Sequence, residues 1–186
     1  MGLSKTNRSR PHSNNISNLT RMKRKISPPL LSAAARTAPV AARSTFPYHV
    51  TCGAIAVDAA GRVLQIRHKE LERWLLPGGH LENEDESLVD AALRELREET
   101  GITGNLFPNE PFAPIDIDPH PIPENAAKGE PAHVHFDCRF MIEVRPGSVT
   151  LQTTEVDGHR WQPAQSLSGR VGARVRAALV ARERSK

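Results

Sequence analysis

Two kinds of hydrophobic pattern divide the chain beyond residue 46. Apolar runs of strand length occupy 49–57, 62–68, 74–76 and 133–144, and each is bounded by residues that favour turns. Segment 87–101 instead repeats its apolar positions with the helical period, and 169–185 is a second helical segment. Strands on both sides of an internal helix, with a helix at the end, predict an α+β or mixed α/β domain.

The segments between these elements are less regular. Residues 49–57 and 62–68 predict a hairpin around the DAAG turn, and 102–117 predicts strand, turn and strand. Residues 118–131 form a proline-rich stretch that predicts a loop insertion. Segment 150–161 returns the chain as a further strand before the last helix.

The helix at 87–101 has clear boundaries. Ser87 is suited to be its N-cap, and Gly101 follows as the C-terminal glycine. A helical wheel predicts one arc facing the core, with the glutamates at its rim and Asp90, Arg94 and Arg97 on the outer side. The predicted core arc consists of Leu88, Val89, Ala92, Leu93 and Leu96, and the rim glutamates are Glu95, Glu98 and Glu99.

Charge is distributed unevenly along the chain. Of 25 basic residues, nine lie within residues 1–44, whereas no acidic residue precedes Asp58, so 45–186 holds 16 basic against 21 acidic residues. The basic, Ser- and Pro-rich stretch 1–44 predicts a disordered extension. We favour a non-specific extension, or sequence upstream of a start at Met22, over an organelle transit peptide. The acidic body argues against a domain that binds nucleic acid through its overall charge.

Cysteine content and hydropathy bear on location. Cys52 and Cys138 have no metal-ligand spacing and favour buried free thiols in a reducing compartment, which predicts a cytoplasmic protein. No segment approaches the ~20 apolar residues that a membrane span requires.

The clustered glutamates need a compensating cation, because like charges three and four residues apart on a helix repel. A salt bridge from Arg94 to Glu98 would account for one of them, but it leaves Glu95 and Glu99 without a partner. A hard divalent ion with oxygen ligands resolves the repulsion better, and Mg²⁺ bound by carboxylates points towards phosphate chemistry. The Gly-Gly turn at 78–79 would let the backbone approach the metal or the phosphates closely.

Residues 79–102 resemble the Nudix box, the signature of the Nudix hydrolases. Gly79 and Glu86 precede an Arg-Glu-apolar-any-Glu-Glu-any-Gly-apolar run from Arg94 to Ile102, and six residues stand between Gly79 and Glu86 where the family has five. The resemblance covers 46 to the end, so we expect a Nudix domain over 45–186. It implies a mixed β-sheet sandwiched between helices, with the box as a loop–helix–loop catalytic motif.

The resemblance also implies a reaction: Mg²⁺-dependent (or Mn²⁺-dependent) hydrolysis of a nucleoside diphosphate linked to another group X. Glu98, Glu99 and the carbonyl of Gly79 would hold the metal. Glu95 would bind metal or act as general base, and Arg94 would orient it. Glu86 would be a supporting partner, for example to Arg94.

Strand 133–144 carries the candidate substrate residues. Alternation places His133, His135, Asp137 and Arg139 on one face, either as a half-exposed polar surface or as part of a substrate cleft. Metal ligation by the His-x-His pair alone is disfavoured. Arg67, at the end of an earlier strand, is a candidate for contact with phosphate.

Several functional alternatives stay open. The domain could be a non-catalytic sensor that binds a nucleotide metabolite, although Glu95, Glu98 and Glu99 argue for an enzyme. The basic stretch could be a nucleic-acid arm, which we disfavour. We expect a small nucleotide-type substrate and no membrane partner; the base, the group X and a homodimeric state are not determined by the sequence.

Overall fold

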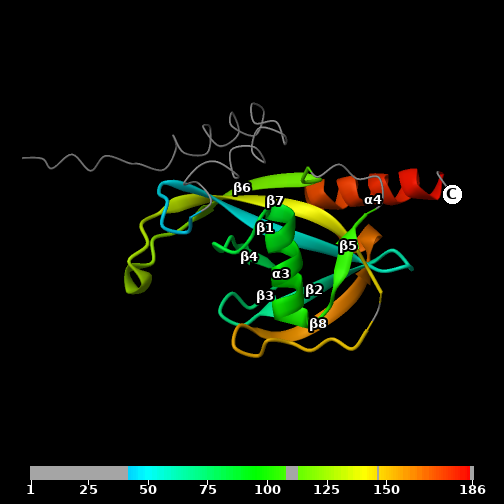
Figure 1. The fold of residues 1–186 in the computed structure, drawn as a ribbon, viewed down its shortest axis with the longest axis horizontal. Coiled ribbons are helices and arrows are strands. Elements are labelled where there is room, and N and C mark those ends of the chain that lie inside the picture. The colour runs from blue at the N-terminus through cyan, green and yellow to red at the C-terminus, as the bar shows by residue number, and fades with distance from the viewer. Residues whose placement is uncertain (1–41, 108–112, 146, 185–186) are drawn as a thin grey trace, which may run out of the picture.

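The computed structural model describes residues 42–107, 113–145 and 147–184. Within them, an eight-stranded mixed sheet forms the centre of the domain (Figure 1), with its main path in the order β3-β2-β1-β7-β5. The strands are β1 (Tyr48–Val57), β2 (Arg62–His68), β3 (Arg73–Leu75), β4 (Gly78–His80), β5 (Gly104–Leu106), β6 (Asp116–Ile122), β7 (His133–Val144) and β8 (Val156–Pro163). The helices are α3 (Leu88–Thr100) and α4 (Gly169–Glu183), with short 3-10 turns at Ala126–Lys128 and Ala164–Ser166.

Strand β1 lies at the centre of the sheet, and both of its faces are buried. It runs parallel to β7 along its whole length, pairs antiparallel with β4, and meets β2 only at the turn between them. The predicted hairpin therefore exists at the turn, but the longer pairings of its two strands are with β7 and β8. The nearly continuous apolar sequence of β1 is typical of a strand with a parallel neighbour, because such strands are covered on both faces.

The two helices cover opposite faces of the sheet. Helix α3 packs Leu88, Val89, Ala92 and Leu96 against alternate residues of β1 and β7, starting from Val50 and Val134. Val175 of α4 packs on the opposite face of the sheet, against a cluster that contains Ile55, Val57 and Met141. These three residues occupy the positions of β1 and β7 that alternate with those facing α3. The predicted mixed sheet between helices is confirmed (Figure 1).

Two expectations about the connecting segments were wrong. The Gly-Gly turn belongs to β4, which pairs with β1, and the first part of the proline-rich stretch is β6, which pairs with β7. Pro119 and Pro121 are tolerated because proline cannot donate to a ladder but fits a strand at the edge of a sheet. Only 123–131 is left as connection, and it contains the 3-10 turn at Ala126–Lys128.

The predicted disorder of residues 1–44 falls almost wholly outside the described residues. Of that stretch, 42–44 are described, and the Arg43 guanidinium pairs with the Glu130 carboxylate at 2.9 Å. In the part of the chain that is described, neither helix has the length and apolar character to cross a membrane.

Candidate active site

The loop–helix motif begins with two closely packed glycines: Gly78 lies against the backbone of β1, and Gly79 lies against the end of the Glu95 side chain. A Cβ on Gly78 would lie 2.3 Å from the Cys52 carbonyl oxygen, and one on Gly79 would lie 2.4 Å from Oε1 of Glu95. The Gly79 carbonyl oxygen also accepts a hydrogen bond from the Cys52 thiol at 3.5 Å. The sequence predicted glycines for close approach to a ligand, and the structure shows close approach to β1 and to the Glu95 carboxylate.

Helix α3 is bounded as predicted. The Ser87 hydroxyl accepts a hydrogen bond from the Asp90 N–H at 3.1 Å, and Gly101, at φ 69°, donates its N–H to the Arg97 carbonyl at 2.8 Å. These caps fix the ends of the helix, and the packing of its apolar face on the sheet fixes its rotation. The glutamate side therefore faces β4.

Glu99 is the most buried of the three glutamates. It is only 7% exposed, and its Oε2 accepts the Gly78 N–H at 2.9 Å. Burial raises the pKa of Glu99 to about 8; the Gly78 hydrogen bond opposes this, and repulsion from Glu95, Glu155 and Glu98 adds to it. Among the residues that the structure describes, no basic side chain pairs with this buried group.

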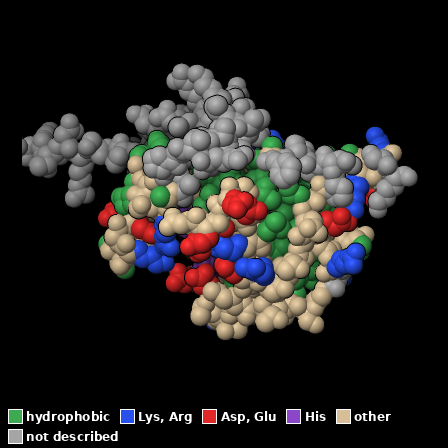
Figure 2. All heavy atoms as spheres, viewed as in Figure 1, with side chains coloured by type: hydrophobic (Ala, Val, Ile, Leu, Met, Phe, Trp, Pro, Cys, Tyr) green, Lys and Arg blue, Asp and Glu red, His purple; other side chains and the backbone are tan. Residues whose placement is uncertain are grey.

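Glu95 and Glu98 complete the cluster. Burial also raises the pKa of Glu95, although the adjacent Arg94 charge works in the opposite direction. Glu98 is nearly half exposed and carries negative charge to the surface. On the face of the molecule that α3 occupies, acidic and basic side chains are interleaved in one region (Figure 2).

Arg94 connects the loop to the helix. Its guanidinium donates to Glu95 at 3.1 Å, to Glu98 at 3.0 Å, to the His80 carbonyl at 2.8 Å and to Asp85 at 2.9–3.3 Å. The hydrogen bonds that Arg94 donates to the Asp85 carboxylate are the main reason why the pKa of Arg94 is raised. The prediction that Arg94 points outward was wrong, because residues 80–85 fold over it and leave its side chain 13% exposed.

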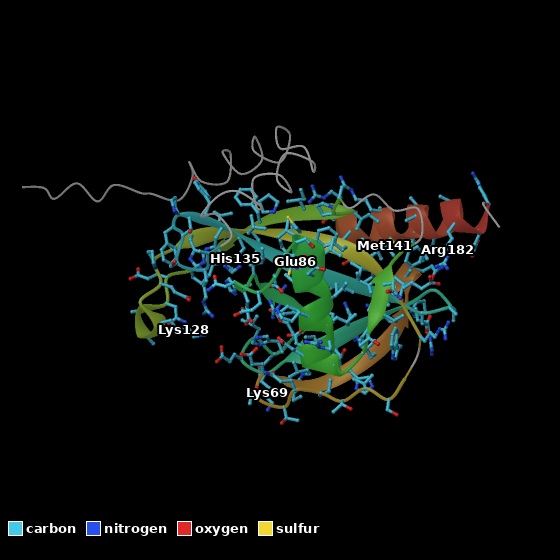
Figure 3. All side chains as sticks on the ribbon, in the orientation of Figure 1. Lys69, Glu86, Lys128, His135, Met141 and Arg182 are labelled. Carbon is cyan, nitrogen blue, oxygen red and sulfur yellow. The ribbon has the colours of Figure 1, made fainter. Side chains whose placement is uncertain are left out.

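Asp85 makes the contact that the sequence spacing suggested for Glu86. The Asp85 side chain is 5% exposed and pairs with Arg94, whereas Glu86 is exposed just before the helix (Figure 3). Counting the family's five residues from Gly79 leads to Asp85, so the additional residue falls between this acidic position and Arg94. That count was the signal that could have identified Asp85.

The donor set of this cluster suits a hard divalent cation. Glu95 and Glu98 share the Arg94 guanidinium, which Asp85 also uses, and Glu155 adds to the negative potential at Glu99. Carboxylate oxygens together with a backbone carbonyl are the ligands that Mg²⁺ takes in proteins. The residues present therefore fit the metal that the sequence suggested.

The predicted substrate residues lie on a different part of the domain. Helix α3 packs on one face of β7, at Val134, Phe136, Cys138 and Phe140. The opposite face of the strand carries the four predicted residues: His133, His135, Asp137 and Arg139. Arg139 is held by Asp116, Asp118 and Asp137 at 2.7–3.4 Å, so its charge is already balanced. Arg67 pairs with Asp157 at 3.0 Å. The structure does not bring these residues into contact with the glutamate cluster.

The structure adds two histidines that the sequence did not suggest. His49 of β1 and His80 of β4 join His133 and His135, with ring centroids 4.5–5.1 Å apart. Burial is the first cause that lowers the pKa of His80 to about 4 and of His135 to about 3, so both rings are neutral near pH 7. No local pattern could have predicted this, because the four residues meet only through strand register.

Comparisons with known proteins identify the same family as the loop–helix motif. The family model described as NUDIX domain matches residues 47–182. The chain is 38% identical over 86 residues to the Lactococcus lactis protein named "Probable DHNTP pyrophosphohydrolase", which covers 46% of this chain and 49% of that protein. It is 39% identical over 67 residues to the RNA pyrophosphohydrolase of Bartonella tribocorum, covering 31% of this chain and 38% of that protein.

Among solved structures, the fold is similar to that of an Ap4A hydrolase from C. elegans, with a TM-score of 0.51 and 17% identity. That match covers 71% of this chain and 97% of the other. The chain spans about half or less of the length of the curated relatives it matches.

Proposed function

The chain belongs to the Nudix family, and on that premise we propose that it is a Mg²⁺-dependent hydrolase of phosphoric anhydride bonds. Its substrate is a nucleoside diphosphate linked to a further group X. Water attacks one phosphorus atom, the bridging P–O bond breaks, and two phosphorylated products leave.

The observation that carries this proposal is the buried carboxyl group of Glu99, for which residues 42–107, 113–145 and 147–184 supply no basic partner. A carboxylate that is 7% exposed, with its pKa raised to about 8 by burial and by neighbouring glutamates, is stabilised by a cation. Buried charges in proteins are paired with an opposite charge or coordinate a metal. The guanidinium that the described residues place in this cluster is that of Arg94, which contacts Glu95, Glu98 and Asp85.

Each residue has a role that follows from its position. Glu98, Glu99 and the Gly79 carbonyl would hold the metal, and Glu95 would either join them or take the proton of the attacking water. Arg94 positions Glu95 and Glu98 and ties them to the loop. The bound Mg²⁺ would polarise the phosphate oxygens and favour deprotonation of water.

The names of the relatives support the proposed type of reaction more than they support any particular substrate. DHNTP, RNA and Ap4A appear in three different names, and two of those names say pyrophosphohydrolase. The shared element is the phosphate anhydride. We therefore extend the type of reaction to this chain and leave the group X to experiment.

The decisive test is turnover of a panel of nucleoside diphosphate derivatives by the full chain, with and without Mg²⁺, and with products identified by mass. We expect Mg²⁺-dependent cleavage that Glu98→Gln abolishes and that the matched control Glu183→Gln, on α4, leaves unchanged. Tight nucleotide binding without turnover would overturn the hydrolase proposal and favour the sensor.

A further inference from the structure

A group of histidines outside the glutamate cluster is assembled by strand register. In the β1–β7 ladder His49 is the partner of His135, and in the β6–β7 ladder His120 is the partner of the same residue. His133 lies two positions earlier on the same face of β7, and His80 arrives on β4, opposite Thr51 of β1. Figure 3 labels His135 at the end of the sheet where β1 and β7 begin.

The ring nitrogens of this group are arranged in a specific way. Nδ1 of His49 contacts the Thr45 carbonyl oxygen at 3.0 Å, and Nδ1 of His133 contacts the Pro131 carbonyl oxygen at 2.7 Å. A carbonyl can only accept, so Nδ1 carries the proton in both rings, and Nε2 of each neutral ring offers a lone pair. Those two nitrogens face Nε2 of His80 at 3.1 Å and Nε2 of His135 at 3.0 Å, respectively.

We propose that His49, His133 and His135, with His80 as fourth ligand, form a binding site for a transition-metal ion of the Zn²⁺ class. Ligand nitrogens of the first three residues lie within 4.8 Å of one another. Adjacent nitrogens around tetrahedral Zn²⁺ are separated by ~3.3 Å, as follows from Zn–N bonds of ~2.0 Å. The 3.0 and 3.1 Å pairs are close to this edge, and the other ligand nitrogens, up to 4.8 Å apart, would have to approach one another when the ion binds.

The surroundings favour such an ion. Metal-binding histidines usually donate their second N–H to a carbonyl or carboxylate, as His49 and His133 do here. Both rings are almost fully buried, at 1% and 5% exposure. Arg43, whose charge would oppose a cation at this place, is neutralised by Glu130 at 2.9 Å.

This site differs from the proposed Mg²⁺ site in ligands and in location. Imidazole nitrogens prefer Zn²⁺ and related ions, whereas Mg²⁺ prefers oxygen. The sheet lies between the two groups, since His133 and His135 occupy the face of β7 away from α3. His80 connects the two groups, because it follows Gly79 in the sequence and its carbonyl oxygen accepts a hydrogen bond from Arg94. The proposal itself does not depend on hydrolysis.

Without a metal, the same distances describe two hydrogen bonds between neutral imidazoles. His80 and His135 would then donate from Nε2 to His49 and His133. Binding of the ion requires both rings to change tautomer: each loses its Nε2 proton to solvent and gains one at Nδ1, so the ring stays neutral. The two states therefore differ in the tautomers of His80 and His135, which can be measured.

The test is a Co²⁺ titration of the untagged full chain in excess Mg²⁺, followed by displacement with Zn²⁺. Tetrahedral Co²⁺ absorbs visible light, and Mg²⁺ keeps the carboxylate site filled. The variants are His133→Gln and His135→Gln, and the matched control is His159→Gln, an exposed histidine on β8. Circular dichroism establishes that each variant folds.

We expect one Co²⁺ per chain that Zn²⁺ displaces and Mg²⁺ does not, with affinity at least ~10-fold weaker in both cluster variants and unchanged in the control. Nitrogen NMR of the unaltered chain provides a second measurement, in which Zn²⁺ shifts Nε2 of His49 and His80. The proposal is overturned if Mg²⁺ displaces the Co²⁺, if the cluster variants bind as tightly as the control, or if the Nε2 resonances do not move.

Discussion

The contact between Asp85 and Arg94 makes a sharp prediction, because the sequence spacing pointed to the neighbouring residue. Asp85→Asn removes the negative charge but keeps the shape of the side chain and one acceptor oxygen. Glu86→Gln makes the same chemical change one position further along. The two variants should therefore differ strongly in stability.

The magnitude follows from the burial of the pair. The two side chains are 5% and 13% exposed, and Asp85 accepts at 2.9–3.3 Å from two guanidinium nitrogens. Breaking a buried pair costs ~3–5 kcal/mol, but Arg94 keeps Glu95, Glu98 and the His80 carbonyl as partners. A hydrogen bond to a charged group is worth ~1.5–3 kcal/mol, so we expect a loss of about 2 kcal/mol.

Urea unfolding and thermal melting measure this loss. About 2 kcal/mol corresponds to a Tm lower by ~4–8 °C for a chain of this size. Glu86→Gln, an exposed change, should stay within ~0.5 kcal/mol of the parent protein, with the m-value unchanged in both variants. Equal losses, or a larger loss for Glu86→Gln, would refute the assignment of Asp85 as the partner of Arg94.

Two other predictions concern the glutamate cluster. In Gly79→Ala the new Cβ meets Oε1 of Glu95 at 2.4 Å, so we expect kcat/KM to fall by ~100-fold in steady-state kinetics; an unchanged value would contradict the packing. Burial raises the pKa of Glu99 from 4.5 to about 8, so the folded protein keeps a proton that the unfolded chain releases in this window. In EDTA, stability should therefore fall as pH rises from about 5 to 8, and Glu99→Gln should remove that slope; equal slopes in unfolding curves would contradict it.

The elements that depend on local signals were predicted well. Helix α3 carries its own N-cap, its own C-terminal glycine and a clear apolar arc, so residues near in sequence determine its start, end and rotation. The three glutamates follow from that rotation. Their common environment was therefore predictable.

The features that were missed depend on residues far apart in sequence. The histidine group requires β1, β4 and β7 to pair in one register, and nothing near His49 or His80 in the sequence indicates it. Arg94 was expected outside because a helical wheel does not include the loop that covers it. The part of β6 beyond residue 117 was missed because Pro119 and Pro121 suggest a loop unless an edge position is known.

The two cysteines, paired in register on β1 and β7, give the protein an internal probe of its opening. Both thiols are buried, and burial raises the pKa of Cys138 to about 12 and that of Cys52 beyond the usual range. Since only the thiolate reacts with alkylating or disulfide reagents, labelling requires the centre of the sheet to separate. The rate of thiol labelling, divided by that of a free cysteine, thus measures the free energy of that separation under native conditions, without denaturant.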